Sequence, residues 1–116
     1  MNELVKRLTK AQPVEVVRPE KKSKALKECI DRDYVHVKFK KTGTEVGIQL
    51  DRKDSKLTGD FDMSNGTVHL VGFLTLNYDK VRCVADIDLA TCDGSGHLEP
   101  VDENEYYRVI KRDAYT

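Results

Sequence analysis

The sequence is poor in the residues that most often build chemical sites. Among its 116 residues there is no tryptophan, and there are only three cysteines and three histidines. Cys29, Cys83 and Cys92 are odd in number, and no two have the C-x-x-C spacing of zinc or redox motifs. We therefore expect no disulfide framework, no metal centre and no cofactor, and we interpret the cysteines as structural.

Long apolar segments are also lacking. The longest uncharged apolar run, 68–76, is about half of the ~20 residues that a transmembrane helix needs. Residues 1–7 have no apolar stretch of the kind that a secretory signal peptide carries. These two absences predict a soluble, cytoplasmic protein that does not bind a membrane.

Catalytic and nucleotide-binding motifs are absent from the sequence as well. The glycine-rich run 93–96 is the nearest candidate for a phosphate loop, but such a loop should open a helix. Here the residues that follow have the pattern of a strand, so the run is better explained as a turn. We expect a protein that is not an enzyme, and a small-molecule-binding half-barrel or a small enzyme stays as an alternative.

The composition is that of a globular protein, with 39% hydrophobic and 34% charged residues. The length favours one domain, which we place at 1–101, with a C-terminal tail at 102–116. Residues 1–58 carry fifteen Lys and Arg against nine Asp and Glu, and residues 59–116 carry five against eleven. The two halves therefore carry +6 and −6, a polarity that can orient a charged partner.

Helical periodicity is confined to the first part of the chain. Apolar residues at helical spacing predict a short helix over 2–11, which Pro13 ends. A second predicted helix runs from Pro19, a residue that helices favour at their first position, to Asp31. Residues 14–17, between the two helices, have the pattern of a short extended piece.

From Tyr34 onward the apolar period changes to two, which indicates strands. Asn65-Gly66 is the strongest hairpin signal, and further turns are expected at 42–43, 77–80 and 93–94. These features predict the α+β class, with one or two N-terminal helices packed on an antiparallel β-meander that curls into a half-barrel. The six predicted strands lie near 34–41, 44–51, 57–63, 67–77, 81–91 and 96–101.

The turn positions also decide which side chains meet on the buried face of the sheet. The predicted cross-strand neighbours are Phe39–Val46, Phe61–Leu70, Met63–Val68 and Leu89–Leu98. The tail stays open to two interpretations. Residues 106–111 form either a seventh strand or an arm that docks on a partner.

One histidine has a predicted carboxylate partner. In the expected register His69 lies across from Asp62, on the face opposite the apolar one. Histidine–carboxylate pairs occur at catalytic and metal sites. The alternative is an exposed cross-strand ion pair without a chemical role.

A second candidate surface lies on the first predicted strand of the meander, where Tyr34, His36, Lys38 and Lys40 share one face. An aromatic ring among lysines can bind single-stranded nucleic acid. Lysine on a strand edge also keeps a sheet soluble. Nucleic-acid binding through the basic N-terminal half is therefore the runner-up function.

The strand near 67–77 is apolar on both faces. Val71 and Phe73 point away from its leucine face, and Val84 lies beside them on the next strand, with Asp86 and Asp88 at the rim. If exposed, these residues form an apolar patch of the kind that marks an interface; alternatively, the first helix or the tail covers them. We predict a small non-catalytic protein-binding module: an accessory subunit, an inhibitor or an immunity-type protein. Its partner is another protein or a second copy of the chain.

Overall fold

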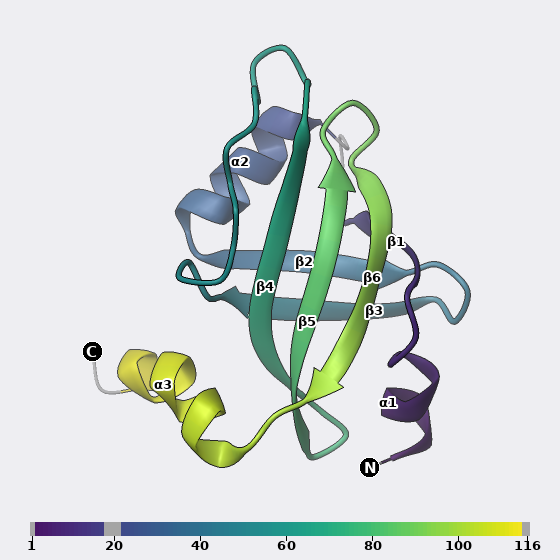
Figure 1. Cartoon of the computed structure of the whole chain (residues 1–116), viewed down its shortest axis with the longest axis vertical. Helices are drawn as coiled ribbons and strands as arrows, with labels where there is room; N and C mark the ends of the chain where they lie inside the picture. Colours follow the sequence, from purple (N-terminus) through teal and green to yellow (C-terminus); the bar gives the residue numbers. More distant parts are fainter. Residues whose placement is uncertain (1, 18–21, 115–116) are drawn as a thin grey trace.

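The computed structural model describes residues 2–17 and 22–114 (Figure 1). Within these residues six antiparallel strands form a closed barrel, with three helices outside it. No helix in the described part of the chain is long and apolar enough to cross a membrane. In chain order the elements are α1 (Glu3–Arg7), β1 (Gln12–Val16), α2 (Ser23–Asp31), β2 (Tyr34–Phe39), β3 (Thr44–Leu50), β4 (Thr67–Leu76), β5 (Asp79–Asp88), β6 (Asp93–Pro100) and α3 (Glu103–Ala114).

The barrel closes because β1 pairs along both of its edges. Val14 of β1 lies opposite Phe39 of β2 on one side and opposite Gly94 of β6 on the other. The α+β class and the antiparallel order are as predicted, but the expected half-barrel is a closed one. The prediction missed this closure because β1 has only five residues and contains Pro13, so its pattern indicated no more than an extended piece.

In the hairpin of β2 and β3 the predicted residues face the core, but they pair across the strands in a different register. Residues 40–43 form the turn, and Val46 lies opposite Val37 instead of Phe39. The shift is two residues, because the chain turns through four residues where two were expected. An even shift preserves the inward face, so Val37, Phe39 and Val46 are all buried.

The last hairpin differs in the same way. The chain turns at 89–92, Asp88 pairs with Asp93, and Leu98 lies opposite Cys83 instead of Leu89. The predicted Asp93-Gly94 turn is instead the first part of β6. Leu89 and Leu98 are both buried, because this shift is also even.

The predicted strand 57–63 is wrong. Residues 51–66 consist mainly of turns, and Met63, which was expected opposite Val68, is 76% exposed. Phe61 is buried, but it does not pair with Leu70, whose partner on β5 is Ala85.

Local hydrogen bonding explains why Asn65-Gly66 does not start a long hairpin. The Asp60 carboxylate accepts the backbone N–H groups of Asp62 and Met63, which folds the chain into a tight loop. That loop closes on a single bridge between Asp60 and Asn65. The neighbour of β4 on this side is therefore β3, which pairs at Gln49↔Phe73 and Leu50↔Gly72.

Helix α1 begins after Asn2, whose side chain accepts the N–H of Val5 at 2.9 Å, and is shorter than the predicted 2–11. Helix α2 follows the predicted apolar stripe and places Leu26 in the core. The proposed start at Pro19 lies outside the described residues.

The tail forms α3 instead of a seventh strand, and Asp102 caps it by accepting the N–H of Glu105 at 2.8 Å.

Apolar side chains from every strand fill the interior of the barrel. Val14, Val37, Ile48, Leu70 and Ile87 are fully buried members of this core. A second, smaller cluster lies outside the barrel, where Phe73 packs against Tyr106 and Val109 of α3. Figure 1 shows α3 at the opposite end of the molecule from α2, attached to the barrel through the end of β6.

Candidate functional site

The centre of the apolar patch predicted on β4 and β5 is buried, and the chain's own C-terminal helix packs on Phe73. Val71 and Phe73 are 4% and 1% exposed. The Phe73 ring packs edge-to-face against Tyr106, with 6.3 Å between the ring centroids. These two residues therefore do not form an exposed interface in this structure. The other predicted members of the patch lie nearer the surface: Val84 is half-buried, and Asp86 and Asp88 are exposed.

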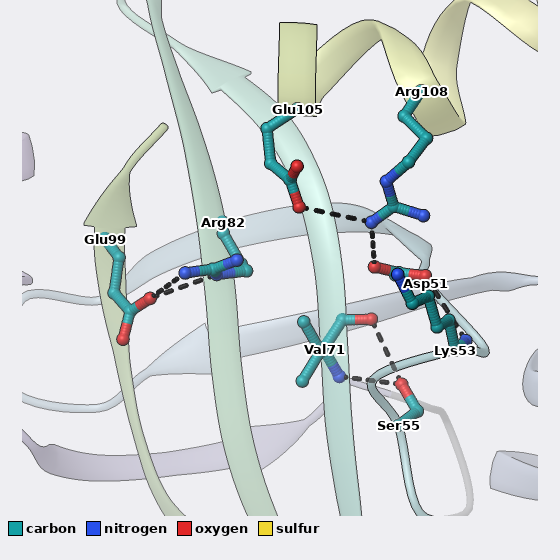
Figure 2. A network of polar contacts seen from close by, with 8 residues as sticks. All are labelled: Asp51, Lys53, Ser55, Val71, Arg82, Glu99, Glu105 and Arg108. Carbon is teal, nitrogen blue, oxygen red and sulfur yellow. Dashed lines mark hydrogen bonds and ion pairs between the residues drawn. The ribbon is translucent and has the colours of Figure 1, made fainter. Parts of the chain in front are cut away.

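Helix α3 is held in place by an ion pair as well as by apolar packing. Figure 2 shows Arg108 reaching down to Asp51, with 2.6 Å between Nη2 and Oδ2. The Asp51 side chain is only 3% exposed, and it also accepts the N–H of Lys53. The hydrogen bond to Asp51 raises the pKa of Arg108. Tyr106 adds a hydrogen bond of 2.9 Å to the hydroxyl of Thr75.

Two histidine–carboxylate pairs lie on the outer face of the sheet, and both differ from the predicted pair of His69 and Asp62. His69 Nδ1 lies 2.7 Å from Oδ1 of Asp86, while Asp62 is exposed in the 51–66 loop. The His69–Asp62 pair is therefore wrong, because β5, and not residues 57–63, lies beside β4 at this point. No group of three metal-ligating side chains occurs among the described residues.

Glu99 is the centre of the second pair. Its Oε2 lies 2.8 Å from His97 Nε2. Its Oε1 accepts hydrogen bonds from Nε and Nη2 of Arg82 at 3.0 and 2.7 Å, as Figure 2 shows. The hydrogen bond with His97, followed by that with Arg82, lowers the pKa of Glu99. Arg82 and Glu99 are 28% and 37% exposed, so solvent screens the pair.

We expect replacement of Glu99 by Gln to make the protein less stable at neutral pH by up to about 1 kcal/mol. The lowered pKa means that the unfolded chain binds the proton more readily, so this stabilisation is present above about pH 4.3 and is lost as the pH falls below it. Urea unfolding of both proteins between pH 7 and pH 3 measures the difference. A difference that grows as the pH falls would contradict this assignment.

The candidate nucleic-acid face on β2 is only partly available. Tyr34 and His36 pack edge-to-face, with their ring centroids 5.1 Å apart. Lys40 Nζ lies 3.0 Å from Asp93 and 3.9 Å from Glu15, so its charge is balanced within the chain. The basic surface is therefore weaker than the sequence suggested.

A groove lies where β3 and β4 separate. Their ladder covers only Gln49↔Phe73 and Leu50↔Gly72. Beyond these pairs, residues 45–47 and 74–76 line a hollow of about 360 Å³. Backbone groups of an antiparallel strand alternate between its two edges, so some groups of β3 face this hollow. A strand edge of this kind can receive a segment of another protein.

Apolar and aromatic side chains supply the walls of the groove. Tyr34 is 46% exposed. Its ring lies directly over Gly47, where a Cβ atom would be only 2.1 Å from the Tyr34 hydroxyl oxygen. Leu76 at the end of β4 and Ile110 of α3 are half-buried and complete the wall. The groove therefore combines a strand edge with a partly apolar surface.

Only part of this groove was predicted from the sequence. Tyr34 was noted, but as part of a nucleic-acid face, and Leu76 was not named as a site residue. The groove depends on where β3 leaves β4, and this contact was hidden by the predicted strand 57–63. The only signal of the groove in the sequence was Gly47, because a glycine inside a strand lets another group approach the backbone closely.

A protein-family model matches almost the whole chain. The family model described as "core binding factor beta subunit" matches residues 2–113, a range that extends from α1 into α3 and includes every strand. No curated protein matches the chain significantly. A beta subunit acts in an assembly with another protein, which supports the prediction of a protein-binding accessory module. The chain belongs to the core binding factor beta subunit family.

Proposed function

We propose that this chain is a non-catalytic subunit that binds one other protein, and that the partner contacts the groove between β3 and β4. The observation that carries the proposal is the separation of the two strands after two residue pairs. A closed barrel has no free edges, and this opening supplies one.

The side chains that line the groove also support protein binding. Tyr34, Leu76 and Ile110 offer apolar contact area, while the edge of β3 offers hydrogen-bonding groups to an extended segment of a partner. Interfaces commonly combine such aromatic and apolar contacts with a polar rim, and the exposed Glu45 lies at this rim. The name of the family favours a different protein over a second copy of the chain as the partner.

Site-specific photo-crosslinking tests the location. A photoreactive amino acid is placed at Glu45 in the groove and, as a matched control, at Asp88 on the far part of β5. Both positions are exposed and acidic. In the native host we expect one protein to be crosslinked from position 45 and not from position 88. A crosslink from position 88 alone would place the interface on the β5 face and contradict the groove.

A further inference from the structure

The turn between β4 and β5 presents a tyrosine that contributes nothing visible to the fold. Leu76 pairs with Asp79, so Asn77 and Tyr78 are the two central residues of the turn. Tyr78 is 96% exposed, more than any other large hydrophobic side chain of the described structure. A side chain this exposed buries almost no apolar surface within its own chain.

The backbone at this position is unfavourable for tyrosine. Asn77 and Tyr78 have φ angles of 48° and 74°. A turn with both central residues at positive φ favours asparagine at the first position and glycine at the second. Asparagine satisfies this preference, but a bulky aromatic residue at positive φ is strained. Strain of this kind is kept where the surrounding structure enforces it, and such positions concentrate at functional sites.

Asn2 enforces the turn from the N-terminal segment. Its backbone N–H donates to Asp79 Oδ2 at 2.7 Å, and its side-chain amide donates to the same oxygen at 2.9 Å. The amide also donates to the carbonyl oxygens of Leu76 and Asn77, at 3.0 and 3.3 Å. Because Asn2 also caps α1, the backbone of the turn that carries Tyr78 is fixed to a helix.

The position of the turn connects Tyr78 to the groove. Leu76, two residues before Tyr78, lines the groove between β3 and β4. Tyr78 itself borders a second hollow, of about 320 Å³, that is also lined by Val81, Pro100 and Val101. A partner seated in the groove and extending past the end of β4 therefore meets the tyrosine.

We propose that Tyr78 is an anchor residue that this chain inserts into an apolar pocket of its partner, a pocket with a hydrogen-bond acceptor for the phenolic hydroxyl. The inference rests on the proposed function, since it requires a protein partner at the adjoining groove. Tyrosine is enriched among the residues that dominate binding energies at interfaces. A turn whose backbone is already fixed loses less backbone entropy on association.

The test compares stability and binding in the same variants. Tyr78→Gly removes the side chain and relieves the positive φ, so we expect its Tm to equal or exceed that of the wild type. The protein crosslinked from position 45, expressed and purified, is the binding probe, and we expect its Kd to rise at least about 30-fold. Tyr78→Phe keeps the ring and should lose less than Tyr78→Gly. Met63→Gly removes the other highly exposed hydrophobic side chain, in the 51–66 loop, and should leave the Kd unchanged.

The outcomes separate the anchor from the proposed function. If the wild type captures no protein in its native host, the proposed function fails and the anchor fails with it. If the wild type binds the probe and Tyr78→Gly binds equally tightly, the proposed function stands and the anchor is overturned. A Tm that falls in Tyr78→Gly would show that the tyrosine stabilises the fold, which would also overturn the inference.

Discussion

Replacement of Gly94 by alanine should lower the free energy of unfolding by about 3 kcal/mol or more. An ideal Cβ at this position would lie 1.9 Å from the carbonyl oxygen of Asp86 and 2.9 Å from its carbonyl carbon. Gly94 cannot move away, because it is paired with Val14 on one side and with Ile87 on the other. The methyl group must therefore push β6 away from β5 or open the seam between β6 and β1.

Urea unfolding, monitored by circular dichroism, measures the loss. Gly43→Ala is the matched control: nothing lies within 4 Å of an added Cβ there, and only its φ of +72° opposes the substitution. We expect this control to cost about 1 kcal/mol. Equal losses in the two variants would show that the close approach at Gly94 does not hold the barrel closed.

Gly94 also shows why the sequence predicted the buried face of each strand better than it predicted which strands and residues pair. Asp93-Gly94 has the composition of a hairpin turn, and nothing local indicates that this glycine lies between two strands. Its role depends on β1, which is about 80 residues earlier in the sequence and has too little alternation to be identified as a strand. A barrel closes through pairing between strands that are far apart in the sequence. The alternation of apolar residues within one strand does not show which distant strand pairs with it.

The faces of the strands were predictable because even register shifts do not change them. Phe39 and Leu98 are buried as expected, although each has a different cross-strand neighbour from the one predicted. Leu89 is also buried, in the turn that follows β5. The same reasoning found the outward apolar residues Val71 and Phe73. It did not decide what covers them, because the tail was left open between a seventh strand at 106–111 and a docking arm, and the structure shows the helix α3 instead.

The candidate site was less predictable than the core for a physical reason. Leu76 belongs to β4, one of the two strands whose separation creates the groove, and Tyr34 reaches the groove from β2 by lying over Gly47 of β3. The separation depends on a β3–β4 contact of only two residue pairs. Tyr78 was placed correctly within a predicted turn, at 77–80. Its strain and its exposure follow from the two-residue loop and from Asn2, and the turn predicted at 77–80 specified neither of them.

Two equally buried phenylalanines should respond differently to truncation. Phe39 belongs to the core of the barrel, while Phe73 belongs to the separate cluster beneath α3. We expect Phe39→Ala to lower the global free energy of unfolding by roughly 3–5 kcal/mol. Phe73→Ala should instead release α3 first, because the barrel strands retain their own core without it. Its cost is therefore limited to the free energy with which α3 docks.

Native-state hydrogen exchange distinguishes the two effects. In Phe73→Ala the amides of α3 should exchange through a local opening much faster than those of β4 and β5, whereas Phe39→Ala should accelerate exchange in all of the barrel strands. Arg108→Ala provides a second route to the same state, because it removes the ion pair with Asp51 and leaves that buried carboxylate without its arginine. If α3 and the barrel exchange at the same rate in Phe73→Ala, the helix is an integral part of the cooperative fold. The outward face of β4 would then be closed to any partner, and binding would be confined to the groove and the turn beside it.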